Sequence, residues 1–449
     1  MKKVLALSLI TVMLIAEDSS SYLILEHSNK IIDSTFTEEG VKSQGNTIIE
    51  NGAFVDNVHI LQKPSSNDDV AGNLIIDSRV TSQGSQIHQG LTHVKSGGKL
   101  QDAKLESENE INNLEVMGGE SFVSQANMVV GEDSNLSNLL NNGDGNDVGD
   151  GTADQFLVKQ KNLIKDISIK NATIHQGLIT IETGSSVSNL ESVQNNRLKR
   201  SQIIGSNEIN ASTVTQGHIQ LKKSLVDNIK QNLDNSIDNL ETNDGIVHQA
   251  SIETSQSTID NINHKQDQNN RGDSVRNEIL NTQVIDASIL QSTLNIDSSL
   301  VETLNKFQKN NVETNNLIQD VKVENNATLS QSTITISNQS HINTIEYKIA
   351  DNTEANLKAI NEIKNVSLQD DSSIEQDSIL LNDSIVNDMS LKRTNRVKNT
   401  DIGNSSNLKQ FYTQIESSRV DKTTFSAKSN LNETQIFNSE VSQSSTTIQ

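Results

Sequence analysis

A glutamine-centred pattern recurs along most of this 449-residue chain. In its clearest copy, within residues 171–191, isoleucines lie two residues before Gln176 and three and five residues after it. Similar spacing surrounds other glutamines, namely Gln89, Gln125, Gln216, Gln249, Gln291, Gln331 and Gln376. The 287 residues from Gln89 to Gln376 hold seven intervals of about 41 residues each, and a fixed period of this size is typical of solenoid and repeat proteins.

Weaker copies extend the pattern toward both ends of the chain. A degenerate copy begins at Gln44, and an incomplete one begins at Gln443. The 67 residues between Gln376 and Gln443 exceed the period, so we expect one copy near Gln414 to have decayed or been replaced. The repeat therefore accounts for nearly the whole chain.

The local spacing of apolar residues predicts strands. They recur with period two on each side of a phase slip at the glutamine, and no helical stripe persists. Gly90, Gly177 and Gly217 supply a turn at the slip. We therefore predict an all-β protein, a parallel β-solenoid (β-helix) built from ~41-residue repeats of about two rungs each. Some 18 to 20 rungs at about 4.8 Å would give a rod on the order of 90 Å long.

A second recurring piece lies between the glutamines and places asparagine or aspartate around an aliphatic residue, as in NLIKDI, NEILNT and NRVKNT. Asparagine tolerates left-handed backbone at corners, and its amide can bond to identical amides above and below. We expect this role for the leading residues of the piece, which are Asn162, Asn207, Asn277, Asn316, Asn361 and Asn395. A glutamine repeated at one corner can form a similar ladder, and we predict that structural role for the repeat glutamines.

The chain divides into three regions by composition. Residues 1–16 combine two lysines with an apolar run too short to span a bilayer, which predicts a secretory signal peptide cleaved after Ala16. Residues 17–69 form an N-terminal region of irregular first rungs. Residues 70–449 form the solenoid domain, interrupted by an acidic Gly/Asp loop at 141–154. We expect a secreted, extracellular or cell-surface protein with no transmembrane segment in the mature chain.

Composition limits the partners and the kind of core. The net charge of −22 repels nucleic acid, so no nucleic-acid partner is expected. There is no cysteine, so stability must come from stacked rungs and not from disulfides. Only 33% of residues are hydrophobic and 2% aromatic, which suits thin rungs filled by small aliphatics better than a globular core. A single proline is consistent with uninterrupted ladders.

The acidic loop is the one candidate metal site. Its oxygen-bearing residues alternate with glycines, as calcium coordination requires, and are Asp144, Asn146, Asp147 and Asp150. The string GDGNDVGDG is similar to one copy of the calcium nonapeptide of repeats-in-toxin proteins, a resemblance that implies bound Ca²⁺. A plain solvated acidic loop is the alternative.

Three histidines directly precede repeat glutamines: His88, His175 and His248. Their separations of 87 and 73 residues place them about four rungs apart under the two-rung prediction, too far for shared metal coordination. We expect them on an exposed strand face. The chain has no phosphate-binding glycine loop, Gly-x-Ser-x-Gly elbow or His-Glu-x-x-His motif, so no catalytic residues are assigned and no enzyme is expected.

The pieces ATIHQG, STVTQG and SQIHQG carry a resemblance to bacterial secreted β-solenoid fibre proteins, with a faint likeness to curli-type subunits. This chain departs from them in its longer period and sparse glycine. The resemblance implies a secreted structural protein, the subunit of a fibre or biofilm matrix that self-associates by stacking solenoid ends, and a cell-surface or secretion partner. Two alternatives are a monomeric adhesin that presents a solenoid face to glycans or host surfaces and a β-helical polysaccharide-degrading enzyme.

Overall fold

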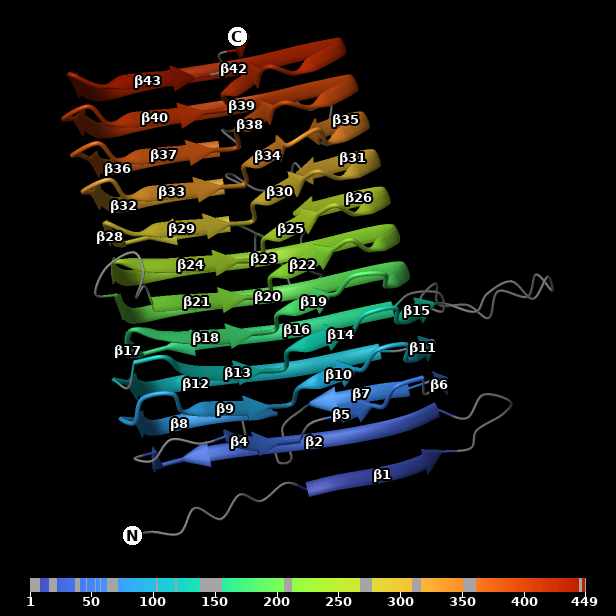
Figure 1. Cartoon of the computed structure of the whole chain (residues 1–449). Coiled ribbons are helices and arrows are strands. Elements are labelled where there is room, and N and C mark those ends of the chain that lie inside the picture. The colour runs from blue at the N-terminus through green and yellow to red at the C-terminus, as the bar shows by residue number, and fades with distance from the viewer. Residues whose placement is uncertain are drawn as a thin grey trace.

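Each glutamine repeat forms one coil of a parallel β-solenoid in the computed structural model (Figure 1). The described residues are 9–15, 22–36, 41–45, 47–52, 54–56, 58–62, 72–101, 104–117, 119–137, 156–205, 212–266, 277–308, 316–349, 361–443 and 446–448. All regular structure in them is strand, which confirms the predicted all-β solenoid. No helix long and apolar enough to cross a membrane occurs in this part of the chain.

Three sheets run along the rod. The glutamine sheet contains β4 (Val41–Gln44), β9 (Gln86–Gln89), β13 (Ser121–Gln125), β18 (Ala172–Gln176), β21 (Ser212–Gln216), β24 (Gly245–Gln249), β29 (Ser288–Gln291), β33 (Thr328–Gln331), β37 (Ser373–Gln376), β40 (Asn407–Gln410) and β43 (Glu440–Gln443). The short sheet contains β5 (Thr47–Ile49), β10 (Thr92–Val94), β14 (Met128–Val130), β19 (Ile179–Ile181), β22 (Ile219–Lys222), β25 (Ile252–Ser255), β30 (Leu294–Asp297), β34 (Ile334–Ser337), β38 (Ile379–Asn382), β41 (Thr413–Glu416) and β44 (Thr446–Ile448).

The return sheet carries the chain from each short-sheet strand back to the next glutamine-sheet strand. Its strands are β1 (Leu9–Ile15), β2 (Tyr22–Ile32), β3 (Thr35–Phe36), β6 (Phe54–Asp56), β7 (Val58–Gln62), β8 (Asn73–Val80), β11 (Lys99–Gln101), β12 (Lys104–Val116), β15 (Asn135–Ser137), β16 (Phe156–Lys165), β17 (Ser168–Lys170), β20 (Ser186–Ile204), β23 (Leu225–Asn243), β26 (Thr258–Gln266), β27 (Asn277–Leu280), β28 (Gln283–Ile285), β31 (Leu300–Gln308), β32 (Asn316–Glu324), β35 (His341–Ile349), β36 (Asn361–Leu368), β39 (Ile385–Gly403) and β42 (Arg419–Phe437). Every pairing is parallel except that of β1 with β2, which is antiparallel.

The strand register corrects the predicted number of rungs. Gln89 pairs directly with Gln125, and Gln125 with Gln176, so one repeat is one coil and not two rungs. The residues assigned to a second rung belong to the return strand, which reaches 19 residues in β20 and β23. Eleven glutamine-sheet strands at about 4.8 Å per coil give a rod on the order of 50 Å long, shorter than predicted.

The turn between the glutamine sheet and the short sheet depends on one left-handed residue directly after the glutamine. Gly90, Gly177 and Gly217 hold φ values of 65°, 71° and 61°, as expected from the phase slip in the sequence. Ala126 and Ala250 adopt the same conformation, which costs a residue with a Cβ more than it costs glycine. The turn therefore has the same geometry in every described coil, whether or not glycine is present.

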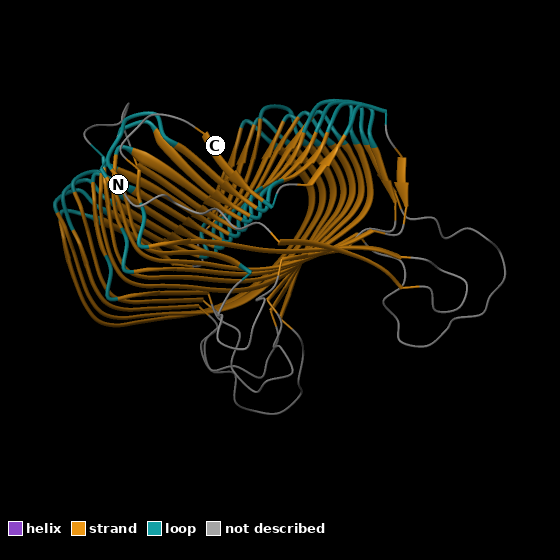
Figure 2. Ribbon diagram, turned by 90° about the horizontal axis from the view of Figure 1, so that it is seen from below, coloured by secondary structure: helices purple, strands orange, loops and turns teal. Residues whose placement is uncertain are grey.

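The cross-section has two lobes joined at a waist (Figure 2). One buried cluster, which includes Ile181 and Val187, fills the lobe between the short sheet and the first part of the return sheet. A second cluster, which includes Ile174 and Leu198, fills the lobe between the glutamine sheet and the second part of the return sheet. Each coil thus needs only a few aliphatic side chains per lobe, which explains how 33% hydrophobic residues suffice.

The glutamine ladder occupies the waist. Gln216 donates a hydrogen bond of 2.9 Å from Nε2 to Oε1 of Gln176 in the preceding coil, and Gln249 donates one of 3.0 Å to Gln216. The same Nε2 of Gln216 donates to the carbonyl oxygen of Arg197 in the return sheet at 3.0 Å. This pattern confirms the predicted ladder and runs without a break through Gln44, Gln89, Gln125, Gln176, Gln216, Gln249, Gln291, Gln331, Gln376, Gln410 and Gln443.

An asparagine ladder faces it from the return sheet. Asn162 donates to Asn196 at 2.8 Å, and similar bonds link the amides from Asn29 to Asn235. Farther along, the same register position is held by Asn277, Asn316, Asn361 and Asn395. Asn207 lies outside the described residues, and this position in the β20 coil belongs to Asn196.

The copy expected to be lost near Gln414 is present. Gln410 pairs with both Gln376 and Gln443 in the glutamine sheet, and Gln414 lies in β41 of the short sheet. The copy is hard to find in the sequence because Phe411 takes the left-handed turn position that glycine, alanine, serine or aspartate fills in the other described coils. The ladder therefore begins at Gln44, ahead of the predicted solenoid boundary, and continues to the last described coil.

We predict that Gln216→Leu destabilises the rod by about 3 kcal/mol. Leucine fills a similar volume but leaves the carbonyl of Arg197 and Oε1 of Gln176 without this donor, and each buried unsatisfied group costs about 1–3 kcal/mol. The change is read from the midpoint of urea unfolding followed by circular dichroism.

Gln220→Leu is the matched control. Gln220 lies in the same coil but points away from the waist and donates a long bond of 3.3 Å to Glu253. Its replacement should change stability by no more than about 0.5 kcal/mol. Equal unfolding midpoints for the two variants would contradict the assigned role of the ladder.

Candidate functional site

A row of left-handed residues bends the return sheet at one position in every coil, and we call it the corner row. Nine of its eleven members are asparagine or aspartate, and the φ values of all eleven lie between 45° and 55°. The members are Asp33, Asp77, Asn113, Asp166, Arg200, Asn239, Asn281, Asp320, Asn365, Asn399 and Glu433. Because the backbone reverses its usual twist there, these side chains point outward from a bend in the sheet.

Only Arg200 and Glu433 depart from asparagine and aspartate in this row. The preference comes from the second recurring sequence piece, in which the first residue joins the asparagine ladder and the fifth takes the corner. In NEILNT, Asn277 holds the ladder position and Asn281 adopts φ 47°. Short polar side chains tolerate the left-handed region better than other residues with a Cβ. The piece therefore encodes an inner ladder and an outer row together.

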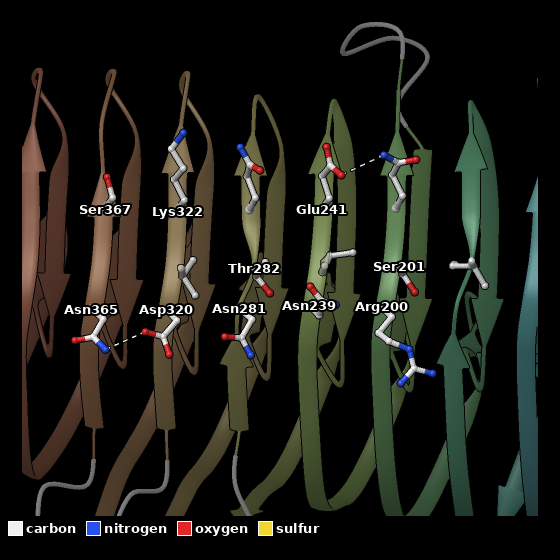
Figure 3. Close-up of a pocket in the computed structure, with 15 residues that line it drawn as sticks. Arg200, Ser201, Asn239, Glu241, Asn281, Thr282, Asp320, Lys322, Asn365 and Ser367 are labelled. Atoms are coloured by element: carbon white, nitrogen blue, oxygen red, sulfur yellow. Dashed lines mark hydrogen bonds between the residues drawn. The ribbon is translucent and has the colours of Figure 1, made fainter.

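A groove of about 680 Å³ follows the corner row over several consecutive coils (Figure 3). One side is formed by corner-row members, and the other by a second row two residues farther along each strand. The corner-row members are Arg200, Asn239, Asn281, Asp320 and Asn365, and the second row is Gln202, Glu241, Gln283, Lys322 and Ser367. Between the two rows lie the buried side chains of Ser201, Leu240, Thr282 and Val321.

Hydrogen bonds along the rod axis hold part of this lining. Asn365 donates to Asp320 at 2.9 Å, and Gln202 donates to Glu241 at 3.2 Å. Gln319 and Asn365 hydrogen-bond to the carboxylate of Asp320 and lower its pKa. The groove therefore keeps Asp320 charged and oriented, although the group is exposed and adds little to stability.

Other polar groups in the groove have no partner in the described part of the chain. The amides of Asn239 and Gln283 and the hydroxyl of Ser367 make no side-chain hydrogen bond there, and Asn239 is exposed. The charged lining residues are equal in number, with Arg200 and Lys322 against Glu241 and Asp320, and both cations are already paired with carboxylates beside the groove, Asp166 and Glu324. The arrangement can offer donors and acceptors to an uncharged polar ligand.

The residues singled out in the sequence do not lie in this groove. The proposed calcium ligands Asp144, Asn146, Asp147 and Asp150 lie outside the described residues. The repeat glutamines are buried in the waist, where their amides bond to one another. Among the described residues, no group of three or more histidine, aspartate or glutamate side chains is arranged to hold a metal ion.

The three histidines correct the prediction of an exposed face. Each is partly buried on the outer side of the glutamine sheet, in contact with rings from neighbouring coils. Phe122 lies with its ring centroid 5.5 Å from that of His88 and 5.0 Å from that of His175, and His218 lies 5.4 Å from His248. The sequence spacing did not anticipate this cover, because Phe122 and His218 come from other coils and other positions of the repeat.

Burial sets the charge of these histidines. Loss of solvation, with a smaller effect from His218, lowers the pKa of His175 to about 4. The same two causes, in the same order, lower the pKa of His248 to about 4, and burial alone lowers the pKa of His88. His218 contacts Glu253 at 3.7 Å, and its hydrogen bond lowers the pKa of that carboxyl group. At neutral pH, His175 and His248 are therefore uncharged.

The left-handed corner was predicted for the leading asparagine of the piece, whereas the structure places it on the fifth residue, as in Asn281 after Asn277, so the groove lining was not predicted. The fifth residue of the asparagine piece was the available signal, since it is polar in coil after coil while its neighbours alternate. The sequence does not show that the residue two positions later, a member of the second row, lies beside the corner residue across the bend. No protein-family model matches the chain, and no curated protein matches it in sequence.

We predict that the rod loses stability as the pH falls from about 6.5 to about 4. Over this interval the unfolded chain binds protons at His175 and His248, whereas the folded chain leaves them neutral, so acid favours unfolding. The full effect is on the order of 3 kcal/mol for each histidine. Urea unfolding at a series of pH values measures it.

The double variant His175→Gln with His248→Gln should lose most of this pH dependence, because glutamine does not titrate. An unchanged slope of unfolding free energy against pH in the double variant would show that other groups are responsible.

Proposed function

We propose that this chain is a secreted structural protein, the subunit of an extracellular fibre or biofilm matrix that assembles by stacking coil on coil. The observation that carries the proposal is the surface of the last described coil. Leu431 and Ile436 in β42 are each 46% exposed, whereas their partners one coil earlier, Val397 and Ile402, are 0% and 2% exposed. The apolar positions of the core thus continue to a surface that another coil would cover.

A second copy of the chain could cover this surface, because the strands at its opposite end follow the same order in the same three sheets. The rod finishes with the return strand β42, the glutamine-sheet strand β43 and the short-sheet strand β44. At the opposite end it starts with the return strand β2, followed by β4 and β5 in the same two sheets. Each sheet would therefore continue from one copy into the next, with β42 beside β2, β43 beside β4 and β44 beside β5.

The glutamine ladder gives the contact a direction. Each glutamine donates to the one in the preceding coil, so Oε1 of Gln443 points toward the open side. Nε2 of Gln44 at the other end donates only a long bond of 3.4 Å to the carbonyl of Lys30 among the described residues. A head-to-tail contact of this kind does not close on itself and produces filaments, and unpaired strand edges favour it.

Strand β1 covers the edge of β2 at the starting end. It spans Leu9–Ile15, within the segment that we expect to be removed during export. Its antiparallel pairing is the one exception to the parallel register of the described sheets. Cleavage after Ala16 would therefore free the edge of β2, so that assembly begins only after secretion.

The central test is the state of assembly of the mature chain, measured by sedimentation velocity and negative-stain electron microscopy. The unmodified chain should form filaments of constant width as its concentration rises. Leu431→Lys and Ile436→Lys should each keep it monomeric, because a buried unpaired charge would lie in every contact.

Leu300→Lys is the matched control. Leu300 is 54% exposed on the side of the rod, so the same change of side chain should leave filaments intact. A mature chain that stays monomeric at high concentration would refute the proposal. So would filaments that form equally well from all three lysine variants.

A separate prediction concerns the leader. A chain that keeps residues 1–16, through replacement of Ala16 by a residue that blocks processing, should stay monomeric because β1 holds the edge of β2. Addition of the mature chain to this precursor should give no elongation from the covered end. Filaments of the uncleaved chain would show that β1 does not control assembly.

A monomeric adhesin is the second candidate function. The groove along the corner row favours it, because it presents ordered polar groups on the side of the rod and not at its ends. Binding to a surface without filament formation would support this role.

A further inference from the structure

We propose that the groove between the corner row and the second row binds a neutral polysaccharide chain that lies along the rod axis. This inference does not depend on end-to-end assembly, because the groove belongs to the side of a single rod. It is carried by the shape of the groove, by its unpartnered polar groups and by its balance of charge.

The shape selects an extended polymer. The groove takes one corner-row residue from each of five consecutive coils, from Arg200 to Asn365, so it runs across the strands and along the stack (Figure 3). Equivalent groups recur about every 4.8 Å. A β-linked chain of pyranose rings advances by a similar length per sugar, so successive sugars would meet equivalent groups. A compact ligand would use only one or two coils of the five.

The polar groups suit hydroxyl ligands. Asn239, Gln283 and Ser367 can donate and accept hydrogen bonds, and none of them has a side-chain partner in the described part of the chain. Sugar hydroxyls are also both donors and acceptors, so they can pair with either end of an amide. Asp320, held in place by Asn365, adds a fixed acceptor in the fourth of the five coils.

Charge decides the class of polysaccharide. The two positive and two negative lining residues cancel, while the chain as a whole carries −22. A polyanion such as a polyuronate would be repelled by the whole molecule and would gain no net attraction in the groove. A polycation would be drawn to acidic surfaces elsewhere. A neutral chain is the ligand for which the groove, and not the overall field, determines binding.

Calorimetric titration with neutral β-linked gluco-oligosaccharides of increasing length tests the proposal. Affinity should rise with length and level off near about five sugars, the span of the five coils. It should be the same at low and high salt, because no net charge is neutralised. Polygalacturonate and chitosan serve as the anionic and cationic comparisons.

A double variant identifies the site. Asn239→Gly with Gln283→Ala removes two unpartnered amides, and glycine keeps the left-handed backbone at the corner. Affinity should fall about tenfold or more, which corresponds to about 1.4 kcal/mol. The matched control is Asn325→Gly with Gln414→Ala, which makes the same changes outside the groove and also at a left-handed position, φ 57°. Its affinity should match that of the unmodified chain.

Three results would overturn the assignment. The first is a lack of binding by every neutral oligosaccharide while the chain is folded by circular dichroism. The second is equal loss of affinity in the double variant and its control. The third is salt-sensitive binding of polygalacturonate or chitosan that the groove variant weakens, since this would assign the groove to a charged polymer.

Discussion

A buried amide must find hydrogen-bond partners wherever water is excluded, and this requirement governs the waist of the rod. Each ladder glutamine after Gln44 donates hydrogen bonds to the glutamine of the preceding coil and to a carbonyl group of the return sheet, as Gln216 does to Gln176 and Arg197. A shift of one residue in a glutamine-sheet strand would turn its glutamine to the outer face and bring a neighbouring residue, such as His175 or Gly177 beside Gln176, to the waist. The ladder therefore fixes register as well as adding hydrogen bonds.

The two lobes follow from that fixed waist. With register set in the middle of the cross-section, each lobe needs only a short row of aliphatic side chains in line from coil to coil, such as Ile174 in one lobe and Ile181 in the other. Stability then comes from nearest-neighbour contacts that repeat, as in other solenoids. Polar outer surfaces can vary freely, which leaves the corner row and the second row available for binding.

The fold class was predictable because it depends on local signals. The phase slip around Gln176 marks a strand, a left-handed turn and another strand, and these are β18, Gly177 and β19. The number of coils was not predictable in the same way. A 19-residue return strand carries no turn signal as clear as the Gln-Gly pair. From sequence alone, part of this strand is therefore assigned to a second rung.

The candidate site shows the same limit. Asn281 could be recognised as a corner residue from its sequence piece, but its neighbour across the bend, Gln283, could not be recognised as part of a groove. The partial burial of His175 could not be predicted from the sequence either, because Phe122 and His218 belong to adjacent coils. Contacts within one repeat can be predicted from the spacing of residues in the sequence. Contacts between different positions of neighbouring repeats can be identified only once the coils are stacked in the structure.

The coils contain different numbers of residues, and this has a consequence for how such a rod can change in evolution. Strand β31 ends at Gln308 and β32 begins at Asn316, and the residues of both strands are paired with the neighbouring coils. The spacing between ladder glutamines ranges from 33 to 51 residues without loss of a single ladder bond. Insertions at these points are thus tolerated by the scaffold, and they offer places where foreign peptides can be displayed at regular heights along it.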